Sequence, residues 1–369
     1  MEKISIRSTL VLSALAAVSI ALLVLVESTK KNVKEDWFNE KIRASNLSKK
    51  AMDHLKAVHY KNEIFVNNIN DPNETGLIGE QYTPITTGSG SLPIKMSTTN
   101  PNFAAMVVQL LKESGVEEGD EVTVCMTGSF PALNISTLAA LQTLRIKPII
   151  ISSVTASSWG ANDPHYTWLD MEHELYKSRI FKFKSVASSI GGNADIGRAL
   201  SLEGRDMVKE AIRRNGIKFL NKGSLQGNIE RRLTLFDENA KKIKLFINIG
   251  GGVASLGSDI NGEKFKNGVS LNVKLKDFVD KKGVMFEMAK KGLPIINLLN
   301  LESLMKKYEL PMEPIPIPEI GKGKLFYAYK YQVSIVALSL FILIALLLGI
   351  IYIDKKQHAL GNEILKTNN

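Results

Sequence analysis

The sequence contains a single cysteine, Cys125, among 369 residues. One thiol excludes an intramolecular disulfide framework and any zinc site built from several cysteines. The sequence also lacks the glycine-rich signatures of dinucleotide and nucleotide loops and the H-E-x-x-H zinc motif, so we expect no cofactor and no metal ion. Clusters of five Lys or Arg residues are absent as well, which argues against nucleic acid as a partner.

Charged residues are missing from two long apolar runs, 8–26 near the start and 333–353 near the end. As helices, these 19 and 21 residues would each extend about 30 Å, the thickness of a bilayer core. The first run could instead be a signal peptide, but it is longer than the usual apolar core, and Glu27, Ser28 and Thr29 provide no small-x-small cleavage site. We therefore predict a membrane-spanning helix at each end.

The two predicted spans would place both ends of the chain on one side of the membrane and residues 27–332 on the other. The N-terminal tail, 1–7, carries Lys3 and Arg7, and the C-terminal tail, 354–369, carries three lysines. By the positive-inside rule, both tails are then cytoplasmic. Lysines also flank the spans on the side of the central segment, but long translocated segments follow the rule less closely. We expect a two-pass cell-membrane protein with an extracytoplasmic central domain.

The segment between the spans divides by composition into four parts. Apolar residues at three- to five-residue spacing over 27–70 predict a stalk helix that continues from the first span. A loop rich in Gly, Pro, Ser and Thr follows at 71–101. Residues 102–310 form the predicted α/β domain, and the Pro/Gly-rich segment 311–332 is a linker into the second span. The apolar stripe of the stalk would pack on this domain or on another copy of the chain.

Short apolar strands alternate with helices in residues 102–310, which is typical of an α/β fold with a largely parallel sheet and flanking helices. The predicted strands are 121–126, 148–152, 181–185, 218–220, 243–249 and 294–297. The predicted helices are 103–114, 131–144, 168–178, 203–215, 224–240 and 284–291.

Small and hydroxyl-bearing residues recur where the predicted strands end. In a parallel sheet these carboxyl ends lie at one edge, where ligands bind and where helix N-termini and free backbone N–H groups attract anions. The candidate ligand-binding residues are Ser129, Ser153, Ser157, Ser158, Gly191, Gly192, Gly250, Gly251 and Gly252. Such loops would suit carboxylates or phosphates, although loops of parallel sheets are often small and polar without binding a ligand.

Ser129 follows a strand and precedes a helix, which is the setting of an activated serine, but it lacks the flanking glycines of the G-x-S-x-G elbow. His165 or His173 could act as its base, with Asp170 orienting the histidine. As a helix N-cap, Ser129 would need no base. A second catalytic possibility is an acid–base carboxylate pair of Asp163 and Asp170. These acidic and histidine residues match no strong metal-ligand spacing.

Five stretches of the chain form a recognisable pattern when they are read together. They are STTNPNFAA (97–105), GSFPALN (128–134), SSVTASSWGANDP (152–164), TWLDME (167–172) and NIGGGVASLG (248–257). With these stretches the chain resembles the poly-γ-glutamate system protein family, over about residues 75–325. The resemblance implies a bacterial membrane protein encoded with the machinery that makes or exports poly-γ-glutamate. It brings no assigned catalytic residues, and His165 and His173 lie outside the matching stretches.

The formal net charge is +10, of which +8 lies in residues 27–332, and this charge suits an acidic partner. Poly-γ-glutamate is a chain of carboxylates, so the resemblance and the anion-binding loops agree. We expect a membrane-anchored accessory protein of poly-γ-glutamate synthesis or export, acting beside other proteins of that system, that binds γ-glutamyl chain or precursor at the Ser/Gly loops. Two alternatives remain: a hydrolase or transferase acting on γ-glutamyl bonds through Ser129 or Asp170, and a scaffold that recruits the synthetase through its helices.

Overall fold

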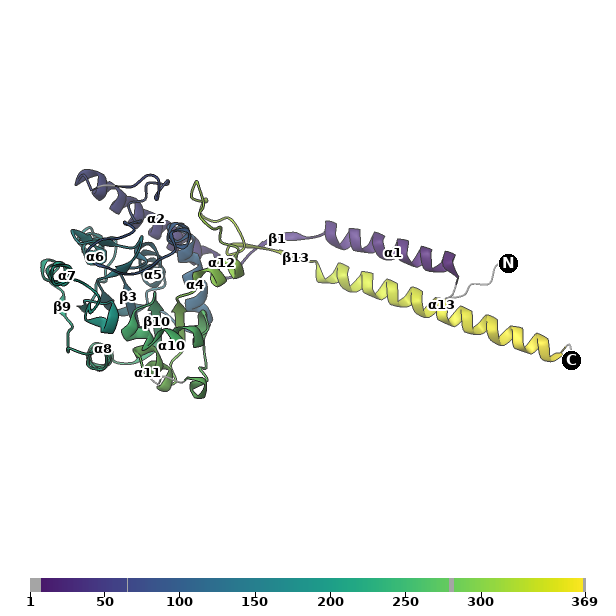
Figure 1. The fold of residues 1–369 in the computed structure, drawn as a ribbon. Helices are drawn as coiled ribbons and strands as arrows, with labels where there is room; N and C mark the ends of the chain where they lie inside the picture. Colours follow the sequence, from purple (N-terminus) through teal and green to yellow (C-terminus); the bar gives the residue numbers. More distant parts are fainter. Residues whose placement is uncertain (1–7, 65, 279–281, 368–369) are drawn as a thin grey trace. The chain divides into compact units, whose positions relative to one another are not determined.

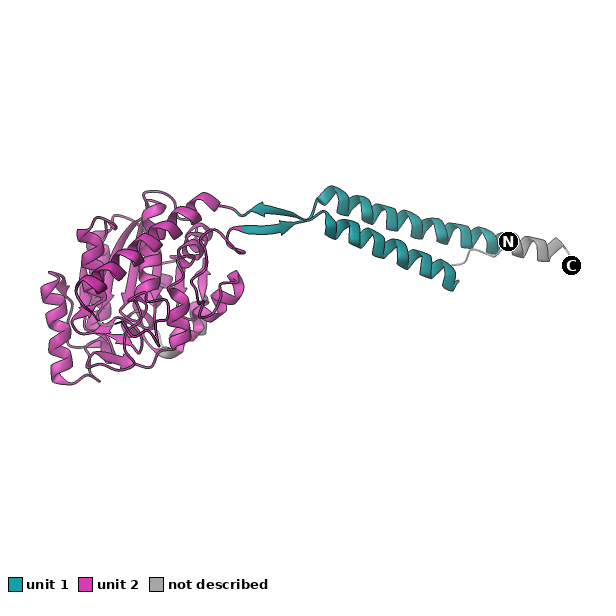
Figure 2. Cartoon of the chain, turned by 90° about the horizontal axis from the view of Figure 1, so that it is seen from above, with its two compact units in different colours: residues 1–35, 327–369 teal, residues 36–326 magenta. Residues whose placement is uncertain are grey.

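The computed structural model describes residues 8–64, 66–278 and 282–367. The chain divides into two compact units, Met1–Glu35 with Tyr327–Asn369 and Asp36–Phe326, which Figure 2 colours separately. The N-terminal tail predicted at 1–7 lies outside the described residues.

The first unit consists of two apolar helices and a two-stranded ladder. Helices α1 (Thr9–Ser28) and α13 (Val333–Thr367) contact each other. Strand β1 (Lys31–Lys34) pairs antiparallel with β13 (Tyr327–Lys330), so that Lys31 faces Lys330. The ladder therefore joins two segments that lie almost the whole chain apart in sequence.

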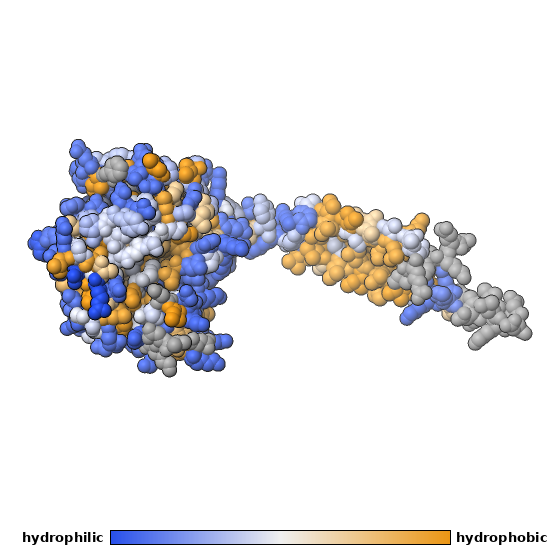
Figure 3. Space-filling view, in the orientation of Figure 1, coloured by the Kyte–Doolittle hydropathy of each residue, from blue (hydrophilic) through white to orange (hydrophobic). Residues whose placement is uncertain are grey.

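Both helices of the first unit contain a stretch that is long and apolar enough to cross a membrane. These stretches are Thr9–Ser28 and Val333–Ala359, and hydrophobic side chains cover their surfaces (Figure 3). They coincide with the runs from which we predicted spans at 8–26 and 333–353. The second helix continues to Thr367, so most of the predicted C-terminal tail is helical.

The stalk helix predicted over 27–70 is interrupted, and that prediction is wrong. Helix α1 ends where the hydroxyls of Ser28 and Thr29 donate to carbonyl oxygens three residues earlier, and the chain then enters β1. Helix α2 (Phe38–Lys61) starts only after Trp37, which has a left-handed φ of 57°. It belongs to the second unit, where its apolar stripe packs on neighbouring helices of the same chain.

A mixed sheet forms the centre of the second unit (Figure 1). Among the described residues it has seven strands in the order β11–β12–β10–β3–β4–β8–β9, and every neighbouring pair is parallel except β11–β12. The strands are β3 (Glu121–Thr127), β4 (Lys147–Ser153), β8 (Ala187–Ser189), β9 (Lys218–Phe219), β10 (Ile243–Ile249), β11 (Gly268–Ser270) and β12 (Ile295–Leu298). The unit thus has the predicted α/β class, with a mostly parallel sheet.

The order of the strands reverses once within this sheet. From β3 the chain adds β4, β8 and β9 on one side, and it then returns to add β10 and β12 on the other side of β3. The loops that follow β3 and β10 therefore lead in opposite directions and leave a crevice between them. Ligands of doubly wound sheets bind at such a reversal, outside the carboxyl ends of the strands.

Helices surround this sheet and bury its apolar residues. Helices α2, α4 and α5 contact one another, whereas α8 and α11 pack against the sheet face that carries Cys125, Ile151 and Phe246. The helices of the second unit besides α2 are α3 (Leu92–Thr98), α4 (Phe103–Glu113), α5 (Pro131–Thr143), α6 (Trp168–Lys177), α7 (Leu202–Arg214), α8 (Leu225–Asn239), α9 (Val253–Leu256), α10 (Asp259–Lys264), α11 (Val284–Lys290) and α12 (Leu301–Tyr308). Short strands β2 (Thr86–Gly88) and β5 (Ala156–Ser157) pair with each other outside the central sheet.

One predicted strand is wrong, and the segments predicted as a loop and a linker contain regular or buried structure. The strand predicted at 181–185 is wrong, because the chain enters the sheet only at β8. Instead, the main-chain N–H of Lys182 donates to the Gln142 side chain, and that of Ser185 donates to the Glu172 carboxylate. The predicted loop 71–101 contains β2 and α3, and the predicted linker 311–332 buries Phe326 in the second unit.

Candidate functional site

A cavity of about 770 Å³ opens at the carboxyl ends of β3, β4 and β10. Thr127 ends β3 and lies in register with Ser153, which ends β4, so the loops after both strands start at the same level. The glycine loop after β10 supplies Gly251 and Gly252 from the other side of the sheet reversal. The cavity therefore occupies the crevice that the strand order creates.

Two glycines let the loops after β3 and β4 approach each other backbone to backbone. The Gly128 N–H donates to the Ser153 oxygen at 3.0 Å, and a Cβ atom on Gly128 would lie only 2.4 Å from the Val154 oxygen. A Cβ on Gly160 would lie 2.9 Å from the Ser129 Cα. Both positions exclude a side chain, and this close approach brings the serine after β3 next to the serines after β4.

Ser129, Ser157 and Lys95 form a hydrogen-bonded cluster in the cavity wall. The Lys95 Nζ donates to the main-chain oxygen of Ser129 and lies 2.8 Å from the Ser157 Oγ. The Ser157 N–H donates to the Ser129 Oγ at 3.0 Å. The two serines are half-buried, whereas Lys95 is only 2% exposed. The lysine thus lines the cavity beside the two serines although almost all of its surface is buried.

The surroundings of Lys95 disfavour its charged form. Among the described residues, no acidic side chain forms an ion pair with it, and only the Phe130 ring, whose centre lies 4.1 Å from its Nζ, offers a cation–π contact that favours the charge. Burial lowers the pKa of Lys95 from 10.5 to about 7. Neutral and charged forms of this amine are therefore both populated near neutral pH.

The site that the structure forms contains most of the predicted ligand-binding residues. Those that line the cavity are Ser129, Ser153, Ser157, Gly192, Gly251 and Gly252. Ser158, Gly191 and Gly250 are not in the lining and shape the loops instead: the Ser158 N–H donates to the Gly88 oxygen, and both glycines have positive φ angles. Six of the nine predicted residues therefore line this cavity, and the other three lie in the loops beside it.

The structure does not bring Asp170 to the cavity. One Asp170 oxygen accepts hydrogen bonds from the N–H and the hydroxyl of Thr167, which caps helix α6. The same carboxylate pairs with Arg214 on α7 and accepts a hydrogen bond from Asn215. These contacts give Asp170 a role in joining two helices.

The histidines weighed as bases for Ser129 do not line the cavity either. Neither His165 nor His173 is in its wall, and within the described part of the chain no hydrogen bond links Ser129 Oγ to a histidine. The basic group beside these serines is Lys95, which sequence reasoning missed. A signal for it exists, because Lys95 is the sole charged residue between Glu80 and Lys112.

A buried ion pair holds the loops after β4 and β8 next to the cavity. The Arg232 and Asp195 side chains are 2% and 1% exposed, and their closest atoms are 2.6 Å apart. Arg232 also donates to the Ser189 hydroxyl at 2.7 Å, and the cavity-lining Ser153 hydroxyl lies 3.3 Å from Asp195. The Ser153 hydroxyl is thus oriented by its contacts with both members of the ion pair.

The one thiol of the chain, Cys125, is buried and does not line the cavity. Burial raises the pKa of the Cys125 thiol to about 11, which keeps it protonated and unreactive. The described residues contain no group of three or more His, Cys, Asp or Glu side chains that could hold a metal ion.

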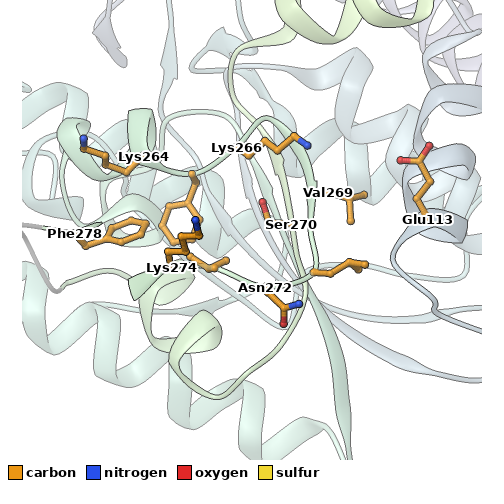
Figure 4. A pocket seen from close by; sticks show the side chains of 11 residues that line it. Glu113, Lys264, Lys266, Val269, Ser270, Asn272, Lys274 and Phe278 are labelled. Atoms are coloured by element: carbon orange, nitrogen blue, oxygen red, sulfur yellow. The ribbon is translucent and has the colours of Figure 1, made fainter. Parts of the chain in front are cut away.

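A second hollow, of about 930 Å³, lies beside the edge strand β11 (Figure 4). Lys264, Lys266 and Lys274 surround it, with Glu113 of α4 across from them. None of these four charged side chains is buried. Solvent therefore screens these charges. Unlike the first cavity, this hollow has no buried polar side chain among the described residues that line it.

Compared with known proteins, the chain matches no family model, no curated protein and no solved structure.

Proposed function

We propose that this chain is a membrane-anchored accessory protein of poly-γ-glutamate synthesis or export, and that its second unit binds γ-glutamyl chain or precursor. The observation that carries the proposal is the cavity at the sheet reversal, whose wall combines the Ser129, Ser153 and Ser157 hydroxyls with glycine backbone. Hydroxyl and backbone N–H groups are the donors that proteins use for carboxylates. The sequence resemblance supplies the identity of the acidic polymer.

Helix polarity supports an anionic ligand at the same edge of the sheet. Helix α5 starts at Pro131, two residues after Ser129, and α12 starts at Leu301, which lines the cavity. The first N–H groups of a helix and the positive end of its dipole stabilise negative charge. The net charge of +8 on residues 27–332 adds a weaker attraction at longer range.

The two apolar helices support the anchoring and the topology that we propose. With both helices across the cell membrane, the second unit would stand on one side, and the lysines of the tails favour the outer side for it. Protease added to intact cells should then digest the second unit. Complete protection of residues 36–326 in intact cells, with digestion after lysis, would refute the extracytoplasmic location.

Binding can be measured on the full chain in detergent with a fluorescent oligo-γ-glutamate. We expect saturable binding that weakens with salt, and about tenfold weaker binding for Ser129→Ala, because a hydrogen bond to a charged group contributes about 1.5–3 kcal/mol. Ser178→Ala, at the exposed end of α6, is the matched control. An α-linked oligoglutamate tests whether the site reads the linkage or only the charge.

Cells provide the second test of the function. Polymer-producing cells that lack this protein should change the amount, the length or the surface retention of poly-γ-glutamate. If all three stay as in the parent cells, and the purified chain binds no oligomer, the proposed function is wrong.

A further inference from the structure

The Lys95–Ser157 contact has the geometry of a base beside a nucleophile. Ser157 ends the short strand β5, lines the cavity and is half-buried, so a ligand in the cavity can reach its hydroxyl. Lys95 lies in α3 beside it, with Nζ 2.8 Å from the Ser157 Oγ. Although the lysine is only 2% exposed, it also lines the cavity, so its Nζ can exchange a proton with Ser157 and with a group bound there.

A purely structural lysine would be expected to have an acidic partner, since an unpaired buried charge is costly. The described residues give Lys95 none, and its neighbours are the Ser129 main-chain oxygen, the Ser157 hydroxyl and the Phe130 ring. The charged amine donates to both oxygens, whereas the neutral amine can donate to the Ser129 oxygen and accept a hydrogen bond from the Ser157 hydroxyl at the same distance. In this form Lys95 can accept the Ser157 proton.

We propose that Ser157 is a nucleophile and Lys95 its general base, and that this pair cleaves or transfers the γ-glutamyl amide bonds of a chain held in the cavity. The substrate in this inference rests on the proposed function, whereas the pair itself rests on the geometry of the two side chains. It replaces Ser129 with Ser157 as the serine that reacts. Ser129 becomes a positioning residue, because its hydroxyl accepts the Ser157 N–H.

The reaction balances with water or an amine as the second reactant. The Ser157 Oγ attacks the amide carbonyl carbon, and its proton passes to the neutral Lys95 Nζ. The carbon–nitrogen bond then breaks, and Lys95 returns the proton to the leaving amine, which leaves a γ-glutamyl ester on Ser157. Water or the amine of another γ-glutamyl chain attacks this ester, Lys95 takes its proton, and the Ser157 oxygen leaves and recovers that proton.

The neighbouring helix and a close glycine suit this step. Helix α5 begins directly after Phe130, so its positive end lies at the edge of the sheet where the carbonyl oxygen gains negative charge. A Cβ on Gly90 would lie 3.1 Å from the Ser157 Oγ and 3.2 Å from the Lys95 Cε. The loop that contains Gly90 therefore lies in close contact with the pair, and a side chain at this position would crowd both groups.

The pair can be tested by covalent labelling of the full chain in detergent with an alkyl fluorophosphonate. Phosphonylation forms an oxygen–phosphorus bond at the reactive serine and releases fluoride, and peptide mass spectrometry then identifies the residue. We expect the label on Ser157, at least 100-fold slower labelling of Lys95→Met, and no label at this position in Ser157→Ala. Ser178→Ala and Lys147→Met, which replace exposed residues away from the cavity, are the matched controls.

The pH dependence separates a base from a structural lysine. The labelling rate of the wild-type chain should rise about tenfold per pH unit below 7 and level off above it, because burial lowers the pKa of Lys95 to about 7. Lys95→Met should lose this inflection while keeping Cys125 protected from thiol reagents, which shows that the fold is intact. Labelling of Ser157 that is independent of pH between 5 and 9, or unchanged in Lys95→Met, would overturn the pair.

Chain-length analysis of oligo-γ-glutamate incubated with the same samples tests the substrate. Shortening or lengthening of the oligomer that disappears in Ser157→Ala supports the inference. Binding of the oligomer without a change in length and without a label on Ser157 overturns the inference and leaves the proposed function standing. A label on Ser157 without any binding of the oligomer overturns the proposed function and the substrate assigned through it.

Discussion

Replacing Asp195 with asparagine should destabilise the second unit strongly, because it leaves the Arg232 guanidinium buried without its counter-charge. The side chains are 1% and 2% exposed, and Asp195 also accepts hydrogen bonds from Ser189 at 2.8 Å and Asn228 at 2.9 Å. Breaking one side of such a pair costs about 3–5 kcal/mol. Asparagine suits the position otherwise, since it tolerates the left-handed φ of 60° found there.

The double variant Asp195→Asn with Arg232→Met carries the sharper prediction. It removes both charges, and a methionine fills much of the space of the arginine stem, so we expect it to be less destabilised than Asp195→Asn alone. The destabilisation of the double variant is compared with the sum of the losses in Asp195→Asn and Arg232→Met. If the two are equal, lost packing and not the unpaired buried charge causes the effect, and the reasoning is refuted.

The lone cysteine provides the assay under native conditions. Cys125 is 5% exposed and lines a small internal space together with Arg232, so a thiol reagent reaches it only when this region opens. At low reagent concentration the labelling rate reports the free energy of opening. A cost of 3–5 kcal/mol corresponds to roughly 100- to 4,000-fold faster labelling. Glu210→Gln, which breaks an exposed pair on α7, should change the rate less than twofold.

Three further predictions concern pH, packing and the ladder. Burial raises the pKa of Glu172 from 4.5 to about 7, so the folded protein holds this proton more tightly than the unfolded chain, and the free energy of unfolding should fall by roughly 3 kcal/mol between pH 4.5 and 7. Circular dichroism melts should show this fall, and Glu172→Gln should abolish it. Gly128→Ala should destabilise by about 1–3 kcal/mol in the same melts, whereas Gly88→Ala, where nothing lies within 4 Å, should not. Val33→Cys with Ala328→Cys should form a disulfide that changes mobility on a non-reducing gel, because these residues face each other across the ladder, and neither single variant should do so.

The strands of the sheet were predictable where small or turn-forming residues mark their ends in the sequence. β3, β4 and β10 are apolar runs that end at glycine or serine, and the structure places them within one residue of the predicted bounds. The short segment 181–185 was misleading, because Phe181 is buried as a strand residue would be. There the N–H groups are bonded to side chains from distant segments, and no local pattern records those partners.

The site was predictable as a set of loops and not as a set of contacts. Ser129 and Ser157 follow strands, so the parallel topology brings them to one edge. Lys95 sits in a segment that looked like a loop, and its burial depends on α3 folding against two loops that follow other strands. The interruption after α1 was equally hidden, because β1 exists only through its pairing with β13. Both failures concern partners that are far away in the sequence.

The pairing of Lys31 with Lys330 also sets an order of events during synthesis. A ribosome that adds about 5–20 residues per second needs roughly 15–60 s to make the chain between the two strands of this ladder. For that time the newly made part of the second unit is joined to the first unit at one end only. The ladder is therefore among the last contacts of the nascent chain to form, and an arrest of translation before β13 would leave β1 unpaired.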